Sequence, residues 1–301
     1  MGKLNILPEN HDKGSLGRFP SWLHRSLPSG DGLAVTEKIM RTAGLHTVCE
    51  EAKCPNRFEC WSKKTATFLA MGKACTRNCG FCDIDFSKQP KSLDPEEPLQ
   101  VAESVKQLGL KHVVITMVAR DDLPDGGAAH LSLIMKEVRK INPQVTIEVL
   151  TSDFEGKHSS IDIILEAHPE IFNHNIETVR SLTPRVRHKA TYDRTLSVLQ
   201  YVKKHSPKIW VKSGIMVGLG ETEEQIFETL HDLANAGCQI VTIGQYLQPQ
   251  RHKLLVKEFI HPDQFEKYAD FGKSIGIKHM YCGPFVRSSY NASELFSKII
   301  S

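Results

Sequence analysis

Apolar runs typical of strands alternate with helix-like segments through the middle of this chain, and this alternation restricts the fold more than any other feature. Such alternation is typical of βαβ units, whose strands pair in parallel within one sheet. The expected strands span 65–71, 111–118, 145–151, 170–178, 208–219 and 239–249. The expected helices span 99–109, 128–141, 159–167, 191–205, 222–236 and 261–276. The sequence therefore predicts an α/β protein with six β/α units.

Six such units form either an open doubly wound sheet or part of a (β/α) barrel. Nearly unbroken apolar strands indicate a sheet that is covered by helices outside and packed within. Polar residues at the C-terminal ends of several expected strands favour the partial barrel, because the active sites of barrel enzymes lie at the rim that these strand ends form. These residues are Asn173, Asn175, Glu177, Lys212, Ser213 and Gln245. Within one strand, alternate residues share a face, so the first three favour a ligand site over satisfied core polar groups.

Six of the eight cysteines lie between Cys49 and Cys82. The N-terminal segment lacks the apolar core of a secretion signal, and no apolar stretch reaches the roughly 18 residues of a membrane helix. We therefore expect a cytoplasmic protein with no membrane association, in which clustered thiols stay reduced and serve metal binding or catalysis. The formal charge of +3 is too small to indicate a nucleic-acid partner.

The first cysteine motif, CxxxCxxC, places Cys75, Cys79 and Cys82 on a loop directly after the first expected strand. Three thiolates on one short loop hold a soft metal or an iron–sulfur cluster. On a four-iron cluster, three cysteines leave one iron with an open coordination site for a cofactor. The alternative is a zinc site completed by a distant His or Cys, although structural zinc usually takes four ligands.

The second motif, CxxxxCxxxxxC, comprises Cys49, Cys54 and Cys60. Its chemistry is that of another three-ligand cluster site, which needs one further ligand from Cys238, Cys282, a His or a hydroxyl residue. These thiols could instead complete the first site or bind zinc, but two complete triplets make sharing unnecessary. Cys238 lies between an expected helix and strand, where a small core residue is the simpler interpretation.

The first motif, Phe81 before its last cysteine and the six β/α units resemble the radical S-adenosylmethionine (SAM) superfamily. The run 214–221, which contains Gly218, resembles the strand of that superfamily that contacts adenine, although glycine-rich strand ends often serve only close packing. The resemblance implies a partial (β/α)6 barrel and a cluster that reduces SAM to methionine and a 5′-deoxyadenosyl radical. The candidate cofactor contacts are Phe81, Asn173, Asn175, Glu177, Arg185, Arg187, Gly218 and Gln245. The two arginines suit either bidentate binding of a carboxylate or a solvated surface.

Longer strings, which span most of the chain, resemble the lipoyl synthase family: CEEAKCPNRFECW, TATFLAMGKACTRNCGFCDI, RDDLPDGGA, FNHNIETV, KSGIMVGLGET, TIGQYLQP and GPFVRSSY. The resemblance implies the insertion of two sulfur atoms at C6 and C8 of an octanoyl chain on a lipoyl carrier protein. It implies two [4Fe–4S] clusters, one that binds S-adenosyl-L-methionine and an auxiliary one that supplies sulfur. The implied fourth ligand of the auxiliary cluster is Ser289, a hydroxyl whose weak bond suits the release of iron. Without the resemblance, its RSSY string would indicate a helix cap or an exposed turn.

The resemblance also implies partners. The carriers would be the octanoylated lipoyl domains of 2-oxoacid dehydrogenase E2 subunits and the glycine cleavage H protein. A low-potential electron donor such as ferredoxin or flavodoxin and an iron–sulfur carrier for cluster rebuilding would complete the set. Two other functions are weighed: another sulfur-inserting radical enzyme, such as biotin synthase or a methylthiotransferase, and a non-enzymatic iron–sulfur carrier or zinc-binding module. A non-enzymatic carrier or a zinc-binding module would not need six β/α units.

The sequence departs from the family pattern at Met117, Ala119, Lys253, Leu255, Glu258 and Asn291. At Met117 a hydroxyl near the methionine moiety of the cofactor is missing, and the other changes concern substrate-side contacts. All six clustered cysteines and Ser289 are retained. We divide the chain into an N-terminal extension with the second motif (1–62), a partial barrel (63–276) and a C-terminal tail (277–301).

Overall fold

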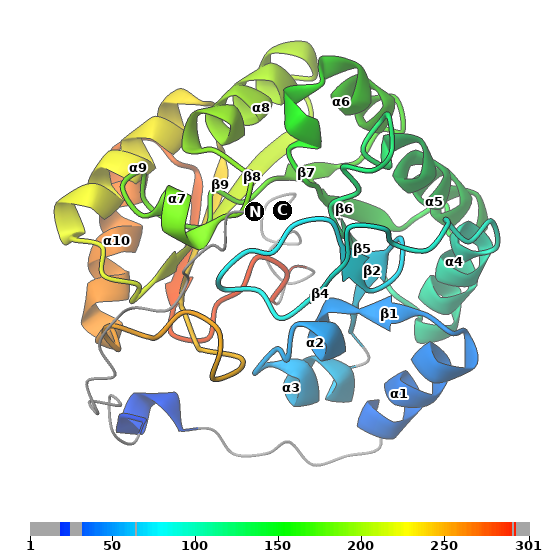
Figure 1. Ribbon diagram of the computed structural model, residues 1–301, viewed down its shortest axis with the longest axis horizontal. Coiled ribbons are helices and arrows are strands. Elements are labelled where there is room, and N and C mark those ends of the chain that lie inside the picture. The colour runs from blue at the N-terminus through cyan, green and yellow to red at the C-terminus, as the bar shows by residue number, and fades with distance from the viewer. Residues whose placement is uncertain (1–18, 25–31, 64, 291, 293–301) are drawn as a thin grey trace.

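The computed structural model describes residues 19–24, 32–63, 65–290 and 292. Within that part of the chain, one eight-stranded sheet has the order β1-β2-β5-β6-β7-β8-β9-β10. β1 (His46–Thr47) pairs antiparallel with β2 (Thr67–Ala70), and each later neighbour is parallel. Figure 1 shows the strands curving around a centre with the helices outside them. The sheet is therefore an open, partial barrel.

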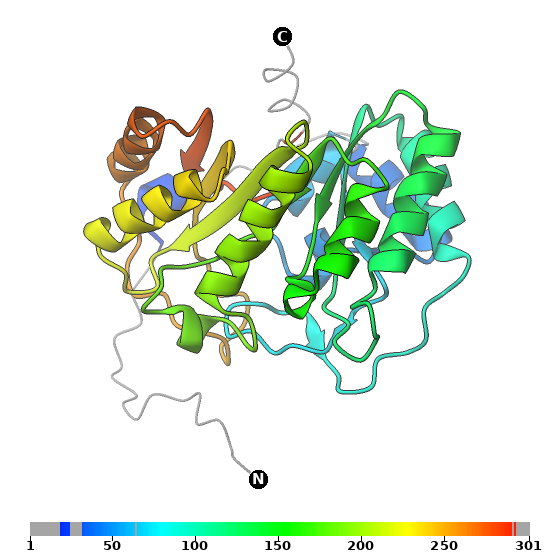
Figure 2. The same cartoon turned by 90° about the horizontal axis from the view of Figure 1, so that it is seen from above.

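The strands that follow β2 in the sheet are β5 (His112–Met117), β6 (Thr146–Leu150), β7 (Ile171–Asn173), β8 (Trp210–Val217), β9 (Ile240–Gln245) and β10 (His279–Gly283). The helices that connect them are α4 (Glu97–Leu108), α5 (Ala128–Ile141), α6 (His158–Leu165), α7 (Thr183–Val186), α8 (Tyr192–His205), α9 (Glu223–Asn235) and α10 (Pro262–Ser274). In the turned view of Figure 2 the long helices pack on the outer face of the sheet. The expectation of six β/α units in a partial barrel is confirmed.

Local signals explain where several helices begin and end. Thr222 forms a capping box with Gln225 at the start of α9, and Thr191 accepts the N–H of Arg194 at the start of α8. Gly109 ends α4 with a φ of 65°, a left-handed conformation that glycine adopts without a steric penalty.

The sheet extends further than the sequence predicts. β1 and β10 belong to it, although they fall in the expected N-terminal extension and C-terminal tail. Four of the five residues of β10 are only partly buried, so this edge strand lacks the continuous apolar run that marks an inner strand. The sheet thus crosses both expected boundaries, and the division into three segments stays a prediction.

The core has an apolar layer between strands and helices, and a polar group inside the barrel. All residues of β5 and of β9 are buried. Inside the barrel, Lys212 Nζ lies 2.8 Å from Glu148 Oε1, and both side chains are fully buried. Lys212 and Ser213 lie in the first half of β8, which continues to Val217, so the prediction that they end this strand is wrong.

Short elements carry the two cysteine motifs. α1 (Gly32–Thr42), α2 (Val48–Glu51) and α3 (Arg57–Ser62) lie together beside β1 (Figure 1). We call residues 71–87 the first cysteine loop; it contains β3 (Ala74–Cys75) and β4 (Asp85–Phe86), which pair in parallel. Two 3₁₀ turns cover Ser21–Leu23 and Phe154–Gly156.

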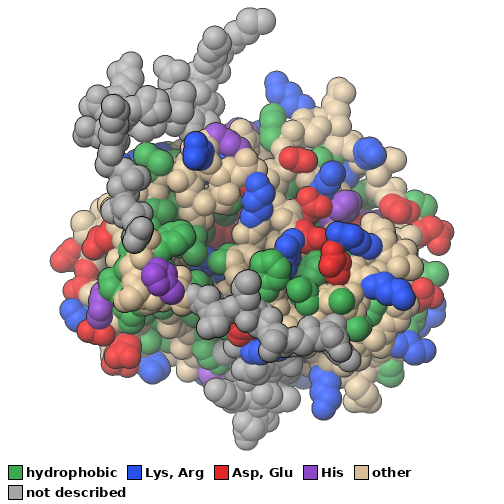
Figure 3. Space-filling view, turned by 90° about the horizontal axis from the view of Figure 1, so that it is seen from below, with side chains coloured by type: hydrophobic (Ala, Val, Ile, Leu, Met, Phe, Trp, Pro, Cys, Tyr) green, Lys and Arg blue, Asp and Glu red, His purple; other side chains and the backbone are tan. Residues whose placement is uncertain are grey.

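Figure 3 shows the molecule of Figure 1 from below. On this face, acidic and basic side chains are interspersed around a group of hydrophobic ones. Among the described residues, none of the helices has both the length and the apolar character needed to cross a bilayer.

Candidate functional site

Two other parts of the barrel donate hydrogen bonds to sulfurs of the first cysteine loop. Cys75 Sγ accepts the N–H groups of Arg77 and Ala119, both at 3.3 Å. Cys79 Sγ accepts the N–H of His188 at 3.4 Å. Ala119 follows β5, and His188 follows α7, so residues remote in sequence meet at these sulfurs. Such N–H···S bonds stabilise negative charge on the sulfur.

The three thiols of this loop share one environment. Burial raises the pKa of Cys82 to about 12, and the neighbouring Cys79 and Cys75 add to the rise. Burial likewise raises the pKa values of Cys75 and Cys79. Metal ligation requires the thiolate, so a bound metal centre would reverse the preference for the protonated form that burial imposes.

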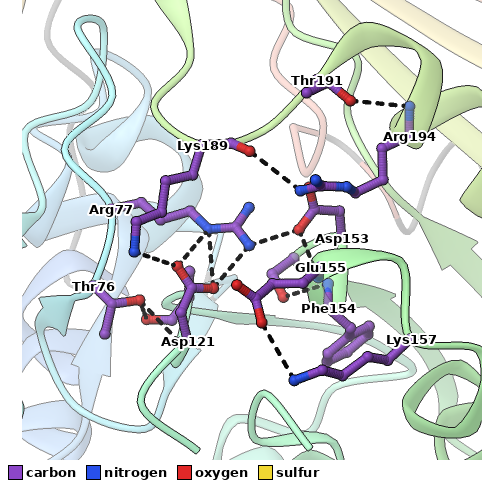
Figure 4. Close-up of polar contacts among 12 residues, drawn as sticks. Thr76, Arg77, Asp121, Asp153, Phe154, Glu155, Lys157, Lys189, Thr191 and Arg194 are labelled. Atoms are coloured by element: carbon purple, nitrogen blue, oxygen red, sulfur yellow. Dashed lines mark hydrogen bonds and ion pairs between the residues drawn. The ribbon is translucent and has the colours of Figure 1, made fainter.

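An ion-pair network, which the sequence analysis missed, anchors this loop to the strand ends (Figure 4). Arg77 Nη2 lies 2.8 Å from Asp121 Oδ1 and 2.6 Å from Asp153 Oδ1. Lys189 Nζ approaches Asp121 Oδ2 at 3.5 Å, and Arg194 Nη1 approaches Asp153 Oδ2 at 3.2 Å. The only signals in the sequence are Arg77 within CTRNC and Asp121 within RDDL, and Asp153 lies in neither string.

The centre of this network is buried. The Arg77 side chain is 6% exposed and that of Asp153 is 0% exposed. Burial alone would raise the pKa of Asp153, but the hydrogen bond and charge of Arg77 hold it far below its ordinary value. Burial alone would lower the pKa of Arg77, but Asp121 and Asp153 raise it. A buried guanidinium between two carboxylates therefore stays charged.

The second triplet lies on α2, α3 and the turn between them. Thr47 begins α2 and accepts the N–H of Glu50 at 3.3 Å. Burial raises the pKa of Cys49 to about 11, and Cys54 adds to the rise. Burial also raises the pKa of Cys60, to about 12, with contributions from Cys49 and Cys54. The structure thus brings the three thiols into one environment, separate from the first loop.

The C-terminal turn, residues 283–290, contacts the second triplet's helix. Asn56 Nδ2 donates to the carbonyl of Phe285 at 2.7 Å. Tyr290 Oη donates to Glu59 Oε1 at 2.8 Å, and Glu59 directly precedes Cys60. Ser289, which precedes Tyr290, therefore lies on a segment that is attached to α3.

The same turn packs against the inside of the barrel, where two glycines leave room for it. A Cβ on Gly214 of β8 would lie 3.0 Å from Ser288 Oγ and 2.8 Å from Asn175 Oδ1. A Cβ on Gly244 of β9 would overlap the carbonyl of Val286. A side chain at either position would displace the turn.

The other two cysteines lie outside both triplets. Cys282 lies on β10, and Met280, two residues earlier, contacts Gly272 of α10. Because alternate residues of a strand share a face, Cys282 also points towards α10. Burial raises its pKa to about 12, although the backbone of Ile243 and the charge of Lys273 on α10 act in the opposite direction. Cys238 is 4% exposed within the apolar core, as expected.

The expected strand over 170–178 is shorter in the structure. β7 ends at Asn173, and Glu177 has a φ of 69°, which interrupts regular strand geometry; the prediction of one continuous strand is wrong. Asn173 Nδ2 donates to Glu148 Oε1 at 3.0 Å inside the barrel. His174 points the other way, with Nδ1 2.9 Å from the carbonyl of Thr151.

Asn175 and Glu177 remain together beyond the end of β7. Asn175 Nδ2 donates to Glu177 Oε1 at 3.1 Å and to Ser288 Oγ at 2.7 Å. Burial raises the pKa of Glu177, although Arg187 and Asn175 favour its charged form. Asn175 therefore contacts both the C-terminal turn and Glu177. The charge of that carboxylate raises the pKa values of Cys79 and Cys82.

The two candidate arginines differ in their surroundings. Arg187 is 9% exposed, and its Nη1 donates to Thr195 Oγ1 at 2.6 Å. Burial lowers the pKa of Arg187, while Glu177 and Cys79 favour its charge. Arg185 lines an apolar pocket with Leu182, Val186, Leu219, Leu254 and Leu255. A role of either arginine in carboxylate binding stays a prediction.

Three further candidates lie around the end of β8. Gly218 has a φ of 96°, and a Cβ there would overlap Gln245 Nε2 and the carbonyl of Glu258. Gln245 is buried; its Nε2 donates to Val217, Tyr246 and Glu258 carbonyls, and its Oε1 accepts the Ile260 N–H at 2.8 Å. Phe81 packs on an apolar cluster that contains Val186, Leu219, Tyr246 and Leu254.

The departures from the family pattern lie near these elements. Met117 is buried at the end of β5, and Ala119 supplies the N–H bonded to Cys75. The carbonyl of Lys253 accepts a hydrogen bond from Gln248, and Leu255 is 48% exposed. Asn291 lies outside the described residues. The structure supplies no reason for the changes themselves.

The donor types at both sites suit iron–sulfur clusters, which are held by cysteine thiolates. Across residues 19–24, 32–63, 65–290 and 292, no group of three or more His, Cys, Asp or Glu side chains is arranged to hold a single metal ion. The two triplets instead form two thiol environments, the first with backbone N–H groups directed at its sulfurs.

Two family models match the sequence. The Radical SAM superfamily model matches residues 69–233, and the model of the N-terminal domain of lipoyl synthase of the Radical SAM family matches residues 8–54. A lipoyl synthase of Protochlamydia amoebophila is 68% identical over 298 residues, which is 97% of this chain and 92% of that protein. A lipoyl synthase of Chlamydia trachomatis serovar D is 55% identical and covers 93% of this chain and 89% of its own length.

Solved structures share the fold at low sequence identity. SuiB of Streptococcus suis bound to S-adenosylmethionine has a TM-score of 0.58 at 14% identity, covering 71% of this chain and 49% of its own. Methylornithine synthase (PylB) has a TM-score of 0.53 at 14% identity, covering 87% of this chain and 81% of its own.

Proposed function

Since the chain belongs to the lipoyl synthase family of radical SAM enzymes, we propose that its two cysteine triplets hold two clusters with different tasks. It is a sulfurtransferase that inserts two sulfur atoms, at C6 and C8, into the octanoyl group of a lipoyl carrier protein. Its cofactors are S-adenosyl-L-methionine and [4Fe–4S] clusters. The observation that carries the residue assignment is the placement of the triplets on different elements: one lies on α2, α3 and the turn between them, and the other lies on the loop that follows β2.

Cys75, Cys79 and Cys82 would hold the cluster that binds SAM. When bound, this cluster and its cofactor supply a 5′-deoxyadenosyl radical that removes hydrogen from the octanoyl chain, and the second cluster supplies the sulfur. Support comes from the N–H groups of Ala119 and His188, which lie on two of these sulfurs. Three protein ligands leave one iron open, as SAM binding requires.

Neighbouring polar groups would receive the rest of the cofactor. Asn175 and Glu177, which are partly buried, and the buried Arg187 form a polar group beside Cys79, which suits the hydroxyl and charged parts of SAM. Gly218 and Phe81 lie at the end of β8 and on the first cysteine loop, where apolar contacts suit the adenine. Asn173, Gln245 and Arg185 are weaker candidates, since the first two bond within the protein and Arg185 lines an apolar pocket.

Cys49, Cys54 and Cys60 would hold the auxiliary cluster, with Ser289 as its fourth ligand. The bonds from Asn56 and Tyr290 support this assignment because they fasten the C-terminal turn to the triplet's helices. Cys282, the alternative ligand, is on the face of β10 that points towards α10. A hydroxyl ligand is easier to displace than a thiolate, which suits a cluster that gives up its sulfur.

The carrier substrates would be E2 lipoyl domains of 2-oxoacid dehydrogenases and the glycine cleavage H protein. Reduction of the first cluster calls for a low-potential donor such as ferredoxin or flavodoxin. Because the auxiliary cluster is consumed, an iron–sulfur carrier would rebuild it. Reduced thiols in both triplets suit work in the cytoplasm.

Replacing each triplet by alanines separates the two tasks. Cys75, Cys79 and Cys82 changed together to Ala should abolish SAM cleavage, because no cluster with an open iron would remain. The same change at Cys49, Cys54 and Cys60 should leave cleavage partly intact but stop sulfur insertion. The measurements are 5′-deoxyadenosine and thiolated product, by mass spectrometry.

The exposed pair Arg180 and Asp193 offers a control outside both triplets, since Arg180→Gln should leave both yields unchanged. Lipoyl product from the variant without Cys49, Cys54 and Cys60 would refute the assignment of the sulfur donor. Cleavage of SAM by the variant without Cys75, Cys79 and Cys82 would refute the assignment of the first cluster.

A further inference from the structure

The amide groups that bond to the first loop's sulfurs are held by side chains that touch neither sulfur. Thr76 N–H donates to the carbonyl of Ala119 at 3.0 Å, and Thr76 Oγ1 donates to the same carbonyl at 3.0 Å. Asp121 N–H donates back to Thr76 Oγ1 at 3.0 Å. The segment after β5 is therefore fastened to the first cysteine loop, and the N–H of Ala119 points at Cys75.

Arg77 closes this arrangement. Its Nε lies 3.1 and 3.0 Å from the two oxygens of Asp121, and its Nη2 reaches Asp121 and Asp153 together. The planar guanidinium thus fixes the loop against strand ends of both β5 and β6. An ammonium on a flexible stem cannot reproduce this fork.

The turn that presents Asp153 is conformationally costly. Phe154 and Glu155 follow it with φ values of 46° and 55°, which non-glycine residues rarely adopt. Asp153 Oδ1 accepts the N–H of Glu155 at 3.0 Å, which stabilises the turn. Such strain persists only where the surroundings determine the conformation, and here it places a buried carboxylate on Arg77.

The same network reaches the amide on the second sulfur. Arg194 donates to Asp153 and to the carbonyl of Lys189 at 3.2 Å. The Lys189 ammonium approaches Asp121 at 3.5 Å, and its neighbour His188 donates its N–H to Cys79. Figure 4 shows the side chains of Asp121, Asp153, Lys189 and Arg194 converging on Arg77 between the loop and the strand ends.

We propose that Arg77, Asp121 and Asp153 are positioning residues that keep backbone N–H groups on Cys75 and Cys79 and thereby set the reduction potential of the cluster. The inference rests on the proposed function in assuming that these thiols hold the SAM-binding cluster. Hydrogen bonds to cluster sulfurs raise the potential, because they stabilise the more negative reduced state. Loss of the network should therefore make the cluster harder to reduce.

Two substitutions that conserve the net charge test the positioning role, so a change in reduction potential cannot come from a gain or loss of charge. Arg77→Lys keeps the cation but loses the fork, and Asp153→Glu keeps the carboxylate but moves it by one methylene. In each, the ratio of reduced to oxidised cluster at a fixed solution potential should fall about tenfold, a shift of about 59 mV for a one-electron couple. The readout is a redox titration of the spectroscopic signal that responds to SAM.

Arg139→Lys is the matched control. Arg139 pairs with Glu170 at 2.9 Å before β7, away from the cysteines, and its loss should leave the potential unchanged. If Asp153→Glu does not take up iron, the reduction potential of Arg77→Lys alone tests the proposal. An unchanged or raised potential in Arg77→Lys, with full iron content, would overturn the proposal.

Hydrogen exchange of the metal-free chain separates this inference from the proposed function. The amide protons of Ala119 and His188 should exchange about tenfold faster in Arg77→Lys than in the unaltered chain or in Arg139→Lys. Equal exchange rates would contradict the positioning role even where the clusters behave as proposed. A SAM-responsive signal that survives loss of Cys75, Cys79 and Cys82 would instead refute the cluster assignment.

Discussion

Ser289 lies between two residues that are bonded to different parts of the molecule. Ser288 accepts a hydrogen bond from Asn175 of the barrel, and Tyr290 donates one to Glu59 of α3. Both flanking residues are thus restrained, which limits how far the Ser289 hydroxyl can move. A hydroxyl ligand at Ser289, as proposed, would therefore be able to leave an iron and still remain near it.

Replacing Ser289 by Cys tests the need for a weak ligand. Ser289→Cys should retain the auxiliary cluster but slow or block the second insertion, because a thiolate binds iron more firmly than a hydroxyl. Cys282→Ala should be nearly silent. The measurements are iron content and the yields of singly and doubly thiolated product. Loss of auxiliary iron in Cys282→Ala, with full activity in Ser289→Ala, would transfer the role to Cys282.

His174 is a buried histidine that the structure keeps neutral. Its Nδ1 donates to the carbonyl of Thr151, and its Nε2 lies 3.2 Å from Thr195 Oγ1. That hydroxyl accepts from Arg187, so its own hydrogen is available to Nε2. Burial, together with the charge of Arg187, lowers the pKa of His174 from 6.5 to about 4.

This shift predicts a loss of stability in mild acid. Between pH 6.5 and about 4 the unfolded chain binds a proton at this histidine and the folded chain does not. The free energy of unfolding therefore decreases as the pH is lowered through this range. The contribution is about 3 kcal/mol across that range. His174→Gln should remove this part of the pH dependence, as measured by urea unfolding of the metal-free chain. An unaltered slope would contradict the neutral, buried state.

At the scale of elements, α3 and the C-terminal turn form one unit although they are far apart in the sequence. Asn56 precedes α3 and bonds to Phe285, and Glu59 within it bonds to Tyr290. α3 has only six residues, too few to be stable by itself. The helix that carries Cys60 therefore depends on the turn that carries Ser289.

Tyr290→Phe tests this dependence by removing one hydroxyl. The auxiliary cluster should lose iron to a chelator several-fold faster, while the first cluster should not change. Tyr201→Phe is a matched control, because Tyr201 also donates to a carboxylate, Asp162, at 2.8 Å, on the outside of the barrel. Equal rates of iron loss in Tyr290→Phe and Tyr201→Phe would show that the contact does not support the cluster.

The sequence predicted the long elements well, because their signals are local. The helix over 128–141 has the expected bounds in α5, since periodicity and packing agree there. α2, α3 and β10 were not predicted, because they are short and depend on contacts with remote segments. β7 was predicted too long, because polar alternation continues to Glu177 whereas the backbone turns after Asn173.

At the scale of the whole molecule, the barrel joins groups that no local pattern relates. The cysteine triplets could be found from spacing alone, since each lies within one short segment. The pairing of Arg77 with Asp153 could not, because it requires the ends of β2 and β6 to meet at one rim. The contact between Asn175 and Ser288 likewise depends on the path of the C-terminal turn into the barrel.

Because each cysteine triplet is proposed to hold one four-iron cluster, the account predicts how much iron the whole chain binds. Anaerobic reconstitution should give about eight irons and about eight sulfides per chain, as two four-iron clusters. The variants without one triplet should each retain about half. A value near four irons in the unaltered chain would contradict the two-cluster account.

The origin of the inserted sulfur tests the central claim most directly. The auxiliary cluster is rebuilt with ³⁴S-sulfide, and the enzyme is given an octanoylated carrier, S-adenosyl-L-methionine and a reductant in a single turnover without free sulfide. We predict that mass spectrometry finds ³⁴S at both C6 and C8 of the product, and that the variant without Cys49, Cys54 and Cys60 forms none. Unlabelled lipoyl product from the labelled enzyme would contradict the account.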